Sequence, residues 1–188
     1  MFRLGEVNKN NRGIKEGKIV QCLAKLSDIT GLAKPVHDKI VKDGCSKRRP
    51  DFYYQDFSDL FHLIVEVDEN QHSRYSCSIE GELRRMITLY EEDSGGFPLI
   101  FIRFNPDPYY YKNKIVKTYS GREKQLSQLI IGLSNRKELL QGINVIYLYY
   151  DNFECVKIES FDYEINDGMI NVKHKHPLHS NNEHSFTI

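Results

Sequence analysis

The sequence predicts one mixed α/β domain built around a single sheet, and three observations support this fold class. A helix-like periodicity opens the chain, three strand-like segments follow it, and helices then alternate with apolar runs toward the C-terminus. The length of 188 residues suits one domain, without an internal repeat or a linker. Residues 1–14 and 167–188 are expected to be flexible, and residues 121–166 are expected to extend the core.

The N-terminal half is predicted to contain one helix and three strands. Apolar residues recur at helical spacing over 15–29, and Gly31 is placed to end this helix in a left-handed cap. Turn signals at 42–44 and 56–59 then separate three segments with strand character. These strands are expected over residues 35–41, 49–55 and 61–68.

The C-terminal half is predicted to alternate helices with strands. Helices are expected over 79–92 and 122–141, and the apolar run 98–104 is typical of a buried central strand. Residues 105–114 contain two prolines two positions apart and are predicted to form a loop. Two more strands are expected over residues 144–150 and 155–160.

The third predicted strand carries the clearest pattern in the chain. Because side chains alternate across a strand, Leu63, Val65 and Val67 share one face, while Glu66 and Asp68 share the other. Carboxylates on a strand this apolar are costly to bury unless they are paired or bind a metal. The alternative is an edge strand that exposes both acids to solvent.

Asp51 adds a third carboxylate on the preceding strand, fifteen residues before Glu66. Hydrolysis of a phosphodiester requires neutralised phosphate charge and an activated water, and Mg²⁺ held by one or two carboxylates supplies both. Asp51, Glu66 and Asp68 are therefore the expected ligands of Mg²⁺, for which Mn²⁺ can substitute.

One histidine and several arginines complete the expected site. His72 follows the third strand and is a candidate for proton transfer, because an imidazole has a pKa of about 6.5; the alternative is a solvated loop histidine. Guanidinium groups bind phosphate bidentately, and four arginines are candidates for this role: Arg49, Arg84, Arg85 and Arg103. Alternatively, Arg84 pairs with Glu80 and Arg85 with Glu82 along their helix.

Composition limits the classes of function. The 26 basic and 26 acidic residues cancel, which disfavours a protein that coats nucleic acid but allows an enzyme with a local basic rim, such as residues 47–49. The tyrosines at 109–111 suit either base stacking or packing of their own loop.

The four cysteines form no close pair, so free thiols are expected rather than structural zinc or disulfides. Without a long apolar run or an apolar leader, a soluble intracellular protein with no membrane segment is expected.

Over residues 36–111, the chain resembles the PD-(D/E)XK, restriction-endonuclease-like nucleases on the segments RRPDF, IVEVDENQH, RRM and PLIFIRFNPD. The similarity is to the branch of very-short-patch-repair and related homing endonucleases, of which members are common in large DNA viruses. It implies an αβββαβ core and Mg²⁺-dependent nicking or double-strand cleavage of DNA. It makes Asp51 the first acid of the motif, Glu66 the second, and His72 the histidine that follows in this branch.

Asp68 departs from the family motif, because it stands where the motif has lysine. Three explanations are open. Asp68 is a further metal ligand with His72 as the base, or a basic residue of the next helix, Arg84 or Arg85, takes the place of the lysine in space. In the third, the site has decayed and the domain only binds DNA. The sequence thus predicts a DNA endonuclease. A catalytically inactive nucleic-acid- or protein-binding module on the same fold is the alternative. Since double-strand cutting usually needs two active sites, a homodimer is also considered.

Overall fold

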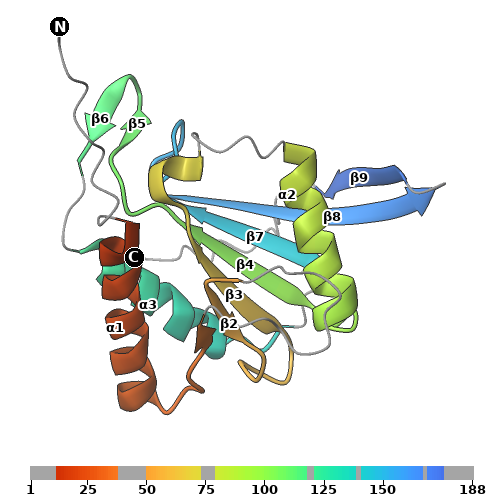
Figure 1. Ribbon diagram of the computed structural model, residues 1–188, viewed down its shortest axis with the longest axis horizontal. Coiled ribbons are helices and arrows are strands. Elements are labelled where there is room, and N and C mark those ends of the chain that lie inside the picture. The colour runs from red at the N-terminus through yellow and green to blue at the C-terminus, as the bar shows by residue number, and fades with distance from the viewer. Residues whose placement is uncertain are drawn as a thin grey trace, which may run out of the picture.

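A seven-stranded mixed sheet forms the middle of the computed structural model, which describes residues 12–37, 50–72, 79–117, 121–138, 141–166 and 169–175 (Figure 1). The strands lie in the order β1-β2-β3-β4-β7-β8-β9. Their bounds are β1 (Val36–His37), β2 (Phe52–Tyr54), β3 (His62–Val67), β4 (Leu99–Phe104), β7 (Ile143–Leu148), β8 (Val156–Asn166) and β9 (Met169–Lys175).

Strands β3, β4 and β7 are parallel to one another, whereas the strands on either side pair antiparallel. The three parallel strands therefore end at the same edge of the sheet. Every residue of β4 is buried, as expected for a strand that is covered on both faces. The predicted α/β class with a mixed central sheet is confirmed.

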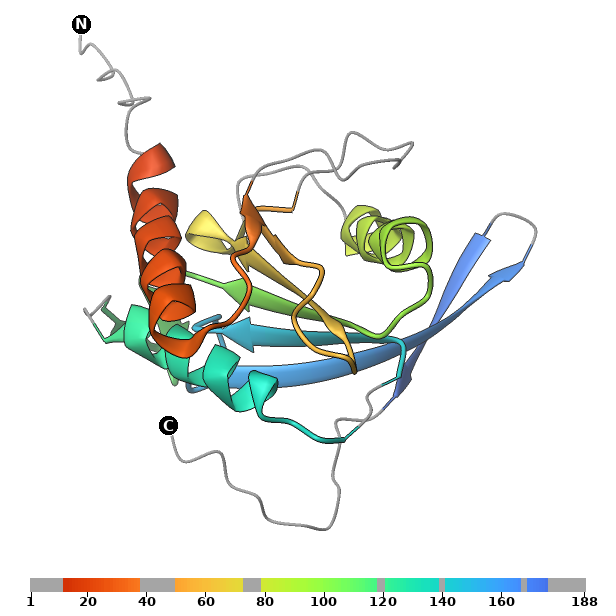
Figure 2. The ribbon, with the colours of Figure 1, turned by 90° about the horizontal axis from the view of Figure 1, so that it is seen from below.

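Helices cover both faces of this sheet (Figure 2). Helices α1 (Arg12–Thr30) and α3 (Arg122–Ser134) pack on one face, and α2 (Ile79–Thr88) packs on the other, continuing as a π-helical turn over Leu89–Asp93. The alternation predicted for the third strand is confirmed, because Leu63 and Val65 join the α1–α3 core while Ile64 joins the α2 core. Within the described segments, no helix has the length and hydrophobicity that a membrane crossing requires.

The prediction of a loop over 105–114 is wrong in part. Strands β5 (Tyr109–Tyr111) and β6 (Lys114–Val116) form a separate antiparallel hairpin. Lys112 and Asn113 connect them, and both have a positive φ, of 49° and 60°. Two consecutive residues of this kind make the tight turn whose twist suits a hairpin. Lysine is not typical of the first position of such a turn, so the sequence did not indicate a hairpin. The loop was predicted from the two prolines instead.

Helix α3 ends at Ser134, earlier than the predicted residue 141. The side chains of Ser134 and Asn135 both donate hydrogen bonds to the carbonyl oxygen of Ile131, at 2.8 and 3.0 Å. Such side chains compete with the backbone and favour the end of a helix. The helix was predicted to continue because apolar residues recur at helical spacing beyond Ser134. That spacing carries no information on side chains that compete for backbone hydrogen bonds.

Regular secondary structure extends further at both ends of the described chain than the sequence predicts. The expected flexible segment from residue 167 contains β9, which pairs with β8, and β8 itself runs to Asn166 instead of ending at 160. Helix α1 begins at Arg12, inside the segment expected to be flexible. Gly31 ends α1 with a φ of 75° and donates its N–H to the oxygen of Ser27, so the predicted cap is confirmed. The turn expected at 42–44 lies outside the described residues.

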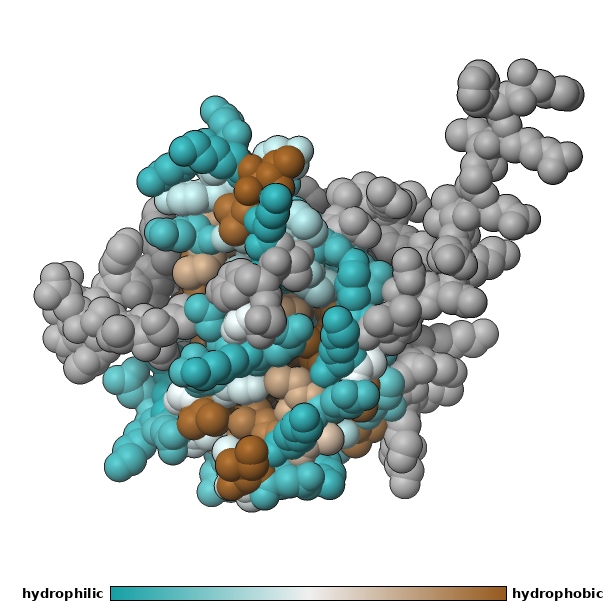
Figure 3. All heavy atoms as spheres, turned by 90° about the vertical axis from the view of Figure 1, so that its left-hand side faces the viewer, coloured by the Kyte–Doolittle hydropathy of each residue, from teal (hydrophilic) through white to brown (hydrophobic). Residues whose placement is uncertain are grey.

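The face that carries α1 and the β5–β6 hairpin is mainly hydrophilic (Figure 3). Hydrophobic side chains appear there in small groups separated by polar atoms. Ile29 and Ile115, on α1 and β6, are examples of exposed apolar residues. Single exposed residues of this kind are normal for a protein surface.

Candidate active site

A row of polar side chains crosses the sheet on the face that α2 covers. The strand registers place Glu66 beside Arg103, Arg103 beside Tyr147, and Tyr147 beside Lys157. The register of β2 with β3, continued by one residue, places Asp51 opposite Glu66. We call these five residues the polar row. It lies near the carboxyl ends of the parallel strands, where ligands bind in open α/β sheets.

Glu66 is the penultimate residue of β3 and is only 6% exposed. Its Oε1 accepts a hydrogen bond from Nη2 of Arg85, at 2.6 Å, which joins strand β3 to helix α2. The pKa of Glu66 is raised to about 7: burial raises it most, the Arg85 guanidinium lowers it in part, and the Asp51 and Asp68 carboxylates add to the increase. Glu66 therefore carries a proton more readily than an ordinary glutamate near neutral pH.

Asp51 is half-buried at the start of β2. Its Oδ2 accepts a hydrogen bond from the backbone N–H of Val67, at 2.7 Å. Burial raises the pKa of Asp51, the bond from Val67 opposes this, and the negative charges of Glu16 and Asp68 raise the pKa again. Asp51 and Glu66, on neighbouring strands, are close enough for the Asp51 carboxylate to raise the pKa of Glu66.

Asp68 follows the last residue of β3 and is 1% exposed. Its Oδ2 accepts hydrogen bonds from Nε of Arg103, at 2.5 Å, and from the hydroxyl of Tyr150. Burial opposes the charge on Arg103, but the Asp68 carboxylate outweighs it, and the pKa of Arg103 is raised. Asp68 is therefore more deeply buried than Glu66 and Asp51.

The alternative of an edge strand with a wet face is wrong for Glu66 and Asp68. Strand β3 has β2 on one side and β4 on the other, and both acids are buried. The cost of burying them is offset by the guanidinium groups of Arg85 and Arg103. Sequence patterning could not distinguish the two cases, because alternation along one strand does not reveal its neighbours.

Among the residues that the structure describes, carboxylates outnumber guanidinium groups around these acids. Four carboxylates belong to this group, since Glu82 on α2 lies 3.3 Å from Nη1 of Arg103, and they face two guanidinium groups. When all six are ionised, two negative charges remain in excess among them. We call Asp51, Glu66, Asp68, Glu82, Arg85 and Arg103 the carboxylate cluster.

A divalent cation is compatible with this donor set. Mg²⁺ prefers carboxylate oxygens, and its usual protein ligands are only one or two carboxylates, completed by water and substrate oxygens. Burial is the main reason that the pKa values of Asp51 and Glu66 are raised, and Arg85 lowers both in part. Within the described part of the chain, however, no three His, Cys, Asp or Glu side chains are grouped closely enough to hold a metal by themselves.

The other predicted site residues lie partly at this site and partly outside the described residues. Arg85 and Arg103 reach the carboxylate cluster, and Arg85 bonds Glu66 while Glu82 pairs with Arg103. Arg84 lies half-buried on α2. His72 ends a 3₁₀ helix (Glu69–His72) directly after β3, where a polar loop was expected, and its side chain lies outside what the structure describes. Arg49 and the rest of the expected basic rim at 47–49 also lie outside it.

The tyrosines at 109–111 support packing of their own segment. Tyr109 is buried, and its ring lies 6.1 Å from that of Tyr149. Its hydroxyl donates to the carbonyl oxygen of Glu154. Tyr110 is exposed. Of the cysteines, Cys22 and Cys155 are free thiols, as expected, while Cys45 and Cys77 lie outside the described residues.

Sequence reasoning missed three contributors to this region. Tyr150 donates to Asp68, Glu82 pairs with Arg103, and Tyr147 belongs to the polar row. The position of the two tyrosines near the end of a strand parallel to β3 is the signal that identifies them. That signal becomes usable only when the order of the strands is known.

Comparison with protein-family models, with curated proteins and with solved structures gives no match for this chain.

Proposed function

We propose that this protein is a metal-dependent DNA endonuclease on a restriction-endonuclease-like fold, with Asp51 and Glu66 as the principal metal ligands. The observation that carries the proposal is the pairing of β2 with β3, which sets Asp51 opposite Glu66 in a cluster whose described residues include more carboxylates than guanidinium groups. The order α1, β1–β3, α2, β4, with an antiparallel meander followed by a parallel strand, supports it. It agrees with the αβββαβ core that the family resemblance implies.

The contacts of each side chain indicate its proposed role. Asp51 and Glu66 would hold the cation, which when bound neutralises phosphate charge and makes water more acidic. Asp68 and Tyr150 orient Arg103, so Asp68 acts as a positioning residue rather than a ligand. Arg85 and Arg103 stabilise the negative charge that develops on the phosphate. His72 remains the proposed group for proton transfer.

The role of Arg85 bears on the missing lysine of the motif. Its guanidinium bonds the second acid of the motif, Glu66, from the adjacent helix. The positively charged guanidinium of Arg85 therefore lies beside Glu66, although Asp68 occupies the lysine position of the motif. Because a guanidinium stays protonated at neutral pH, Arg85 supplies charge but accepts no proton.

The experiment is plasmid cleavage in Mg²⁺ or Mn²⁺ by the wild type, Asp51→Asn and Glu66→Gln. Asp28→Asn is the matched control, because Asp28 is an exposed acid on α1. Removing a ligand should reduce cutting by at least about a hundredfold, since even the partners of metal ligands are worth roughly 10–100-fold. Calorimetric titration with Mn²⁺ should show binding to the wild type and Asp28→Asn only. Equal cutting by all four proteins would contradict the assignment.

A catalytically inactive nucleic-acid- or protein-binding module on the same fold is the second candidate. One observation favours it: Glu66 and Asp68 already have arginine partners, at 2.6 and 2.5 Å. Such ion pairs can stabilise a fold without any metal. Absence of both metal binding and cleavage in the experiment above would support this candidate. Sedimentation of the wild type, with and without DNA, would test whether the protein forms the homodimer that double-strand cutting would need.

A further inference from the structure

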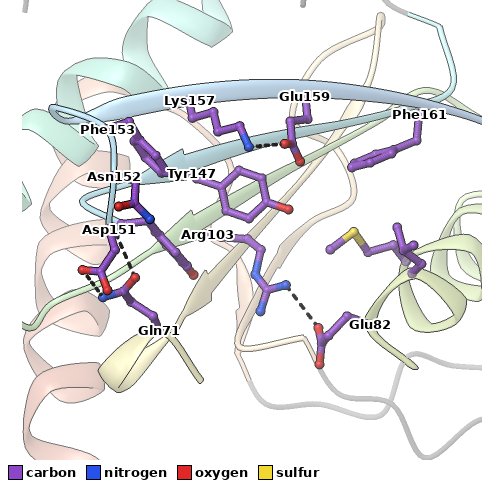
Figure 4. Close-up of a pocket in the computed structure, with 13 residues that line it drawn as sticks. Gln71, Glu82, Arg103, Tyr147, Asp151, Asn152, Phe153, Lys157, Glu159 and Phe161 are labelled. Carbon is purple, nitrogen blue, oxygen red and sulfur yellow. Dashed lines mark hydrogen bonds and ion pairs between the residues drawn. The ribbon is translucent and has the colours of Figure 1, made fainter. Parts of the chain in front are cut away.

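A pocket of about 630 Å³ opens on the α2 face of the sheet, beside the carboxylate cluster (Figure 4). Its walls come from α2, the ends of β4 and β7, the segment 150–153 and β8. The volume lies within the roughly 300–1,000 Å³ that is usual for small-molecule sites. Arg103, Tyr147 and Lys157 of the polar row line it. The pocket and the carboxylate cluster therefore share a wall.

Aromatic rings form one side of this pocket. Tyr147 and Tyr150 meet edge to face with ring centroids 5.2 Å apart, and Phe153 lies parallel to Tyr150 at 6.2 Å. All three side chains are half-buried, so each keeps accessible ring surface. Burial raises the pKa of both tyrosines, and their hydroxyls stay protonated as donors. Ring surfaces of this kind stack on nucleobases with little regard to sequence.

Polar groups of both signs surround the rings. Lys157 pairs with Glu159, and its Nζ lies 5.9 Å from the centre of the Tyr147 ring. Figure 4 shows Tyr147 between Glu159 and Arg103, which in turn points toward Glu82. Because the cations have acidic partners, the pocket is less suited to an extended anion. Ring surfaces beside both hydrogen-bond donors and acceptors suit a flat heteroaromatic ring, whose edge carries both kinds of group.

We infer that this pocket receives the base of an unpaired nucleotide whose neighbouring phosphate lies at the carboxylate cluster. The inference rests on the proposed function and names its substrate class. Asp68 links the two places, because it belongs to the cluster and bonds Arg103 and Tyr150, which line the pocket. A base inside a duplex is stacked and paired, so only a single-stranded, bulged or flipped-out nucleotide can enter.

The test measures binding alone, in EDTA, by fluorescence anisotropy with three labelled duplexes. One is fully paired, one carries a single bulged adenosine, and one carries an abasic residue at the same bulge. The wild type should bind the adenosine bulge about tenfold more tightly than the other two. Tenfold corresponds to ~1.4 kcal/mol, within the stacking energy of one base on an aromatic side chain. Equal binding of all three duplexes would overturn the inference.

Variants assign the preference to the pocket. Tyr147→Ala and Phe153→Ala should lose the preference, whereas Tyr147→Phe should keep it because the ring remains. Tyr110→Ala is the matched control, since Tyr110 is an exposed tyrosine of β5, 55% accessible and not among the pocket residues. Loss of the preference in Tyr110→Ala, or its survival in both pocket variants, would contradict the inference. Bulge preference without metal-dependent cutting would instead count against the proposed nuclease alone.

Discussion

Arg103 and Asp68 form a buried ion pair across neighbouring strands, with Nε of Arg103 2.5 Å from Oδ2 of Asp68. The two residues are 35 positions apart in sequence, so the pair joins the end of β3 to β4. Tyr150 donates to the same carboxylate oxygen from beyond β7. One acid thus connects all three parallel strands at the edge where the candidate site lies.

Asp68→Asn should destabilise the fold strongly. It removes the nearer of two carboxylates that pair with the buried Arg103 and leaves Glu82, 3.3 Å away; breaking a buried pair costs up to about 3–5 kcal/mol. Urea unfolding measures the loss. Asp28→Asn, which breaks the exposed pair with Lys34, should change stability by less than about 1 kcal/mol. Similar effects of the two variants would show that the buried pair contributes little.

Stability in metal-free buffer should decrease as the pH rises from about 4.5 to 7. The folded pKa of Glu66 is about 7, whereas its ordinary value is 4.5, so in this range the folded protein holds a proton that the unfolded chain has released. The full loss, on the order of 3 kcal/mol, is reached above pH 7. Asp51, whose pKa is also raised, acts in the same direction.

Glu66→Gln isolates this contribution. Urea unfolding of the wild type and the variant at pH 5, 6, 7 and 8 gives a difference in which other titrating groups cancel. His62 is one such group, because burial lowers its pKa. The variant should gain stability relative to the wild type as the pH rises. A difference that is independent of pH would refute the raised pKa of Glu66.

Arg122 should be essential for stability although it lies outside the candidate site. This 1% exposed residue donates to the carbonyl oxygens of Asn105 and Asp107, and its guanidinium carbon lies 4.5 Å from the centre of the Tyr149 ring. Arg122→Lys should cost about 3 kcal/mol, because lysine lacks the planar fork that serves several acceptors. Arg136→Lys, at a weaker exposed pair, should cost less than about 0.5 kcal/mol in the same thermal unfolding experiment.

Two glycines, one inside α1 and one directly after it, should respond oppositely to substitution by alanine. Gly31 has a φ of 75°, so Gly31→Ala should lower stability by about 1 kcal/mol. Gly17 lies inside the helix, where a Cβ would meet nothing within 4 Å. Gly17→Ala should therefore raise stability by about 0.5–1 kcal/mol. Effects of the same sign in chemical denaturation would contradict the assigned end of α1.

Much of the fold could be predicted because the strongest signals are local. Apolar spacing predicted α1, α2 and the buried strand β4, and alternation predicted the two faces of β3. Each pattern depends on residues within one or two turns or pleats of each other. The β5–β6 hairpin and the end of α3 escaped prediction because their causes, two left-handed residues and two competing side chains, leave weak traces in sequence.

The sequence by itself determined which elements form and that Glu66 and Asp68 share a face. Tertiary structure alone decided what those acids meet. Arg85 is 19 residues from Glu66, and Tyr150 is 82 residues from Asp68. Contacts across such separations depend on the order of strands and on the face that a helix covers. Since local patterns encode neither, the partners of the acids, and the pocket beside them, became visible only in the folded chain.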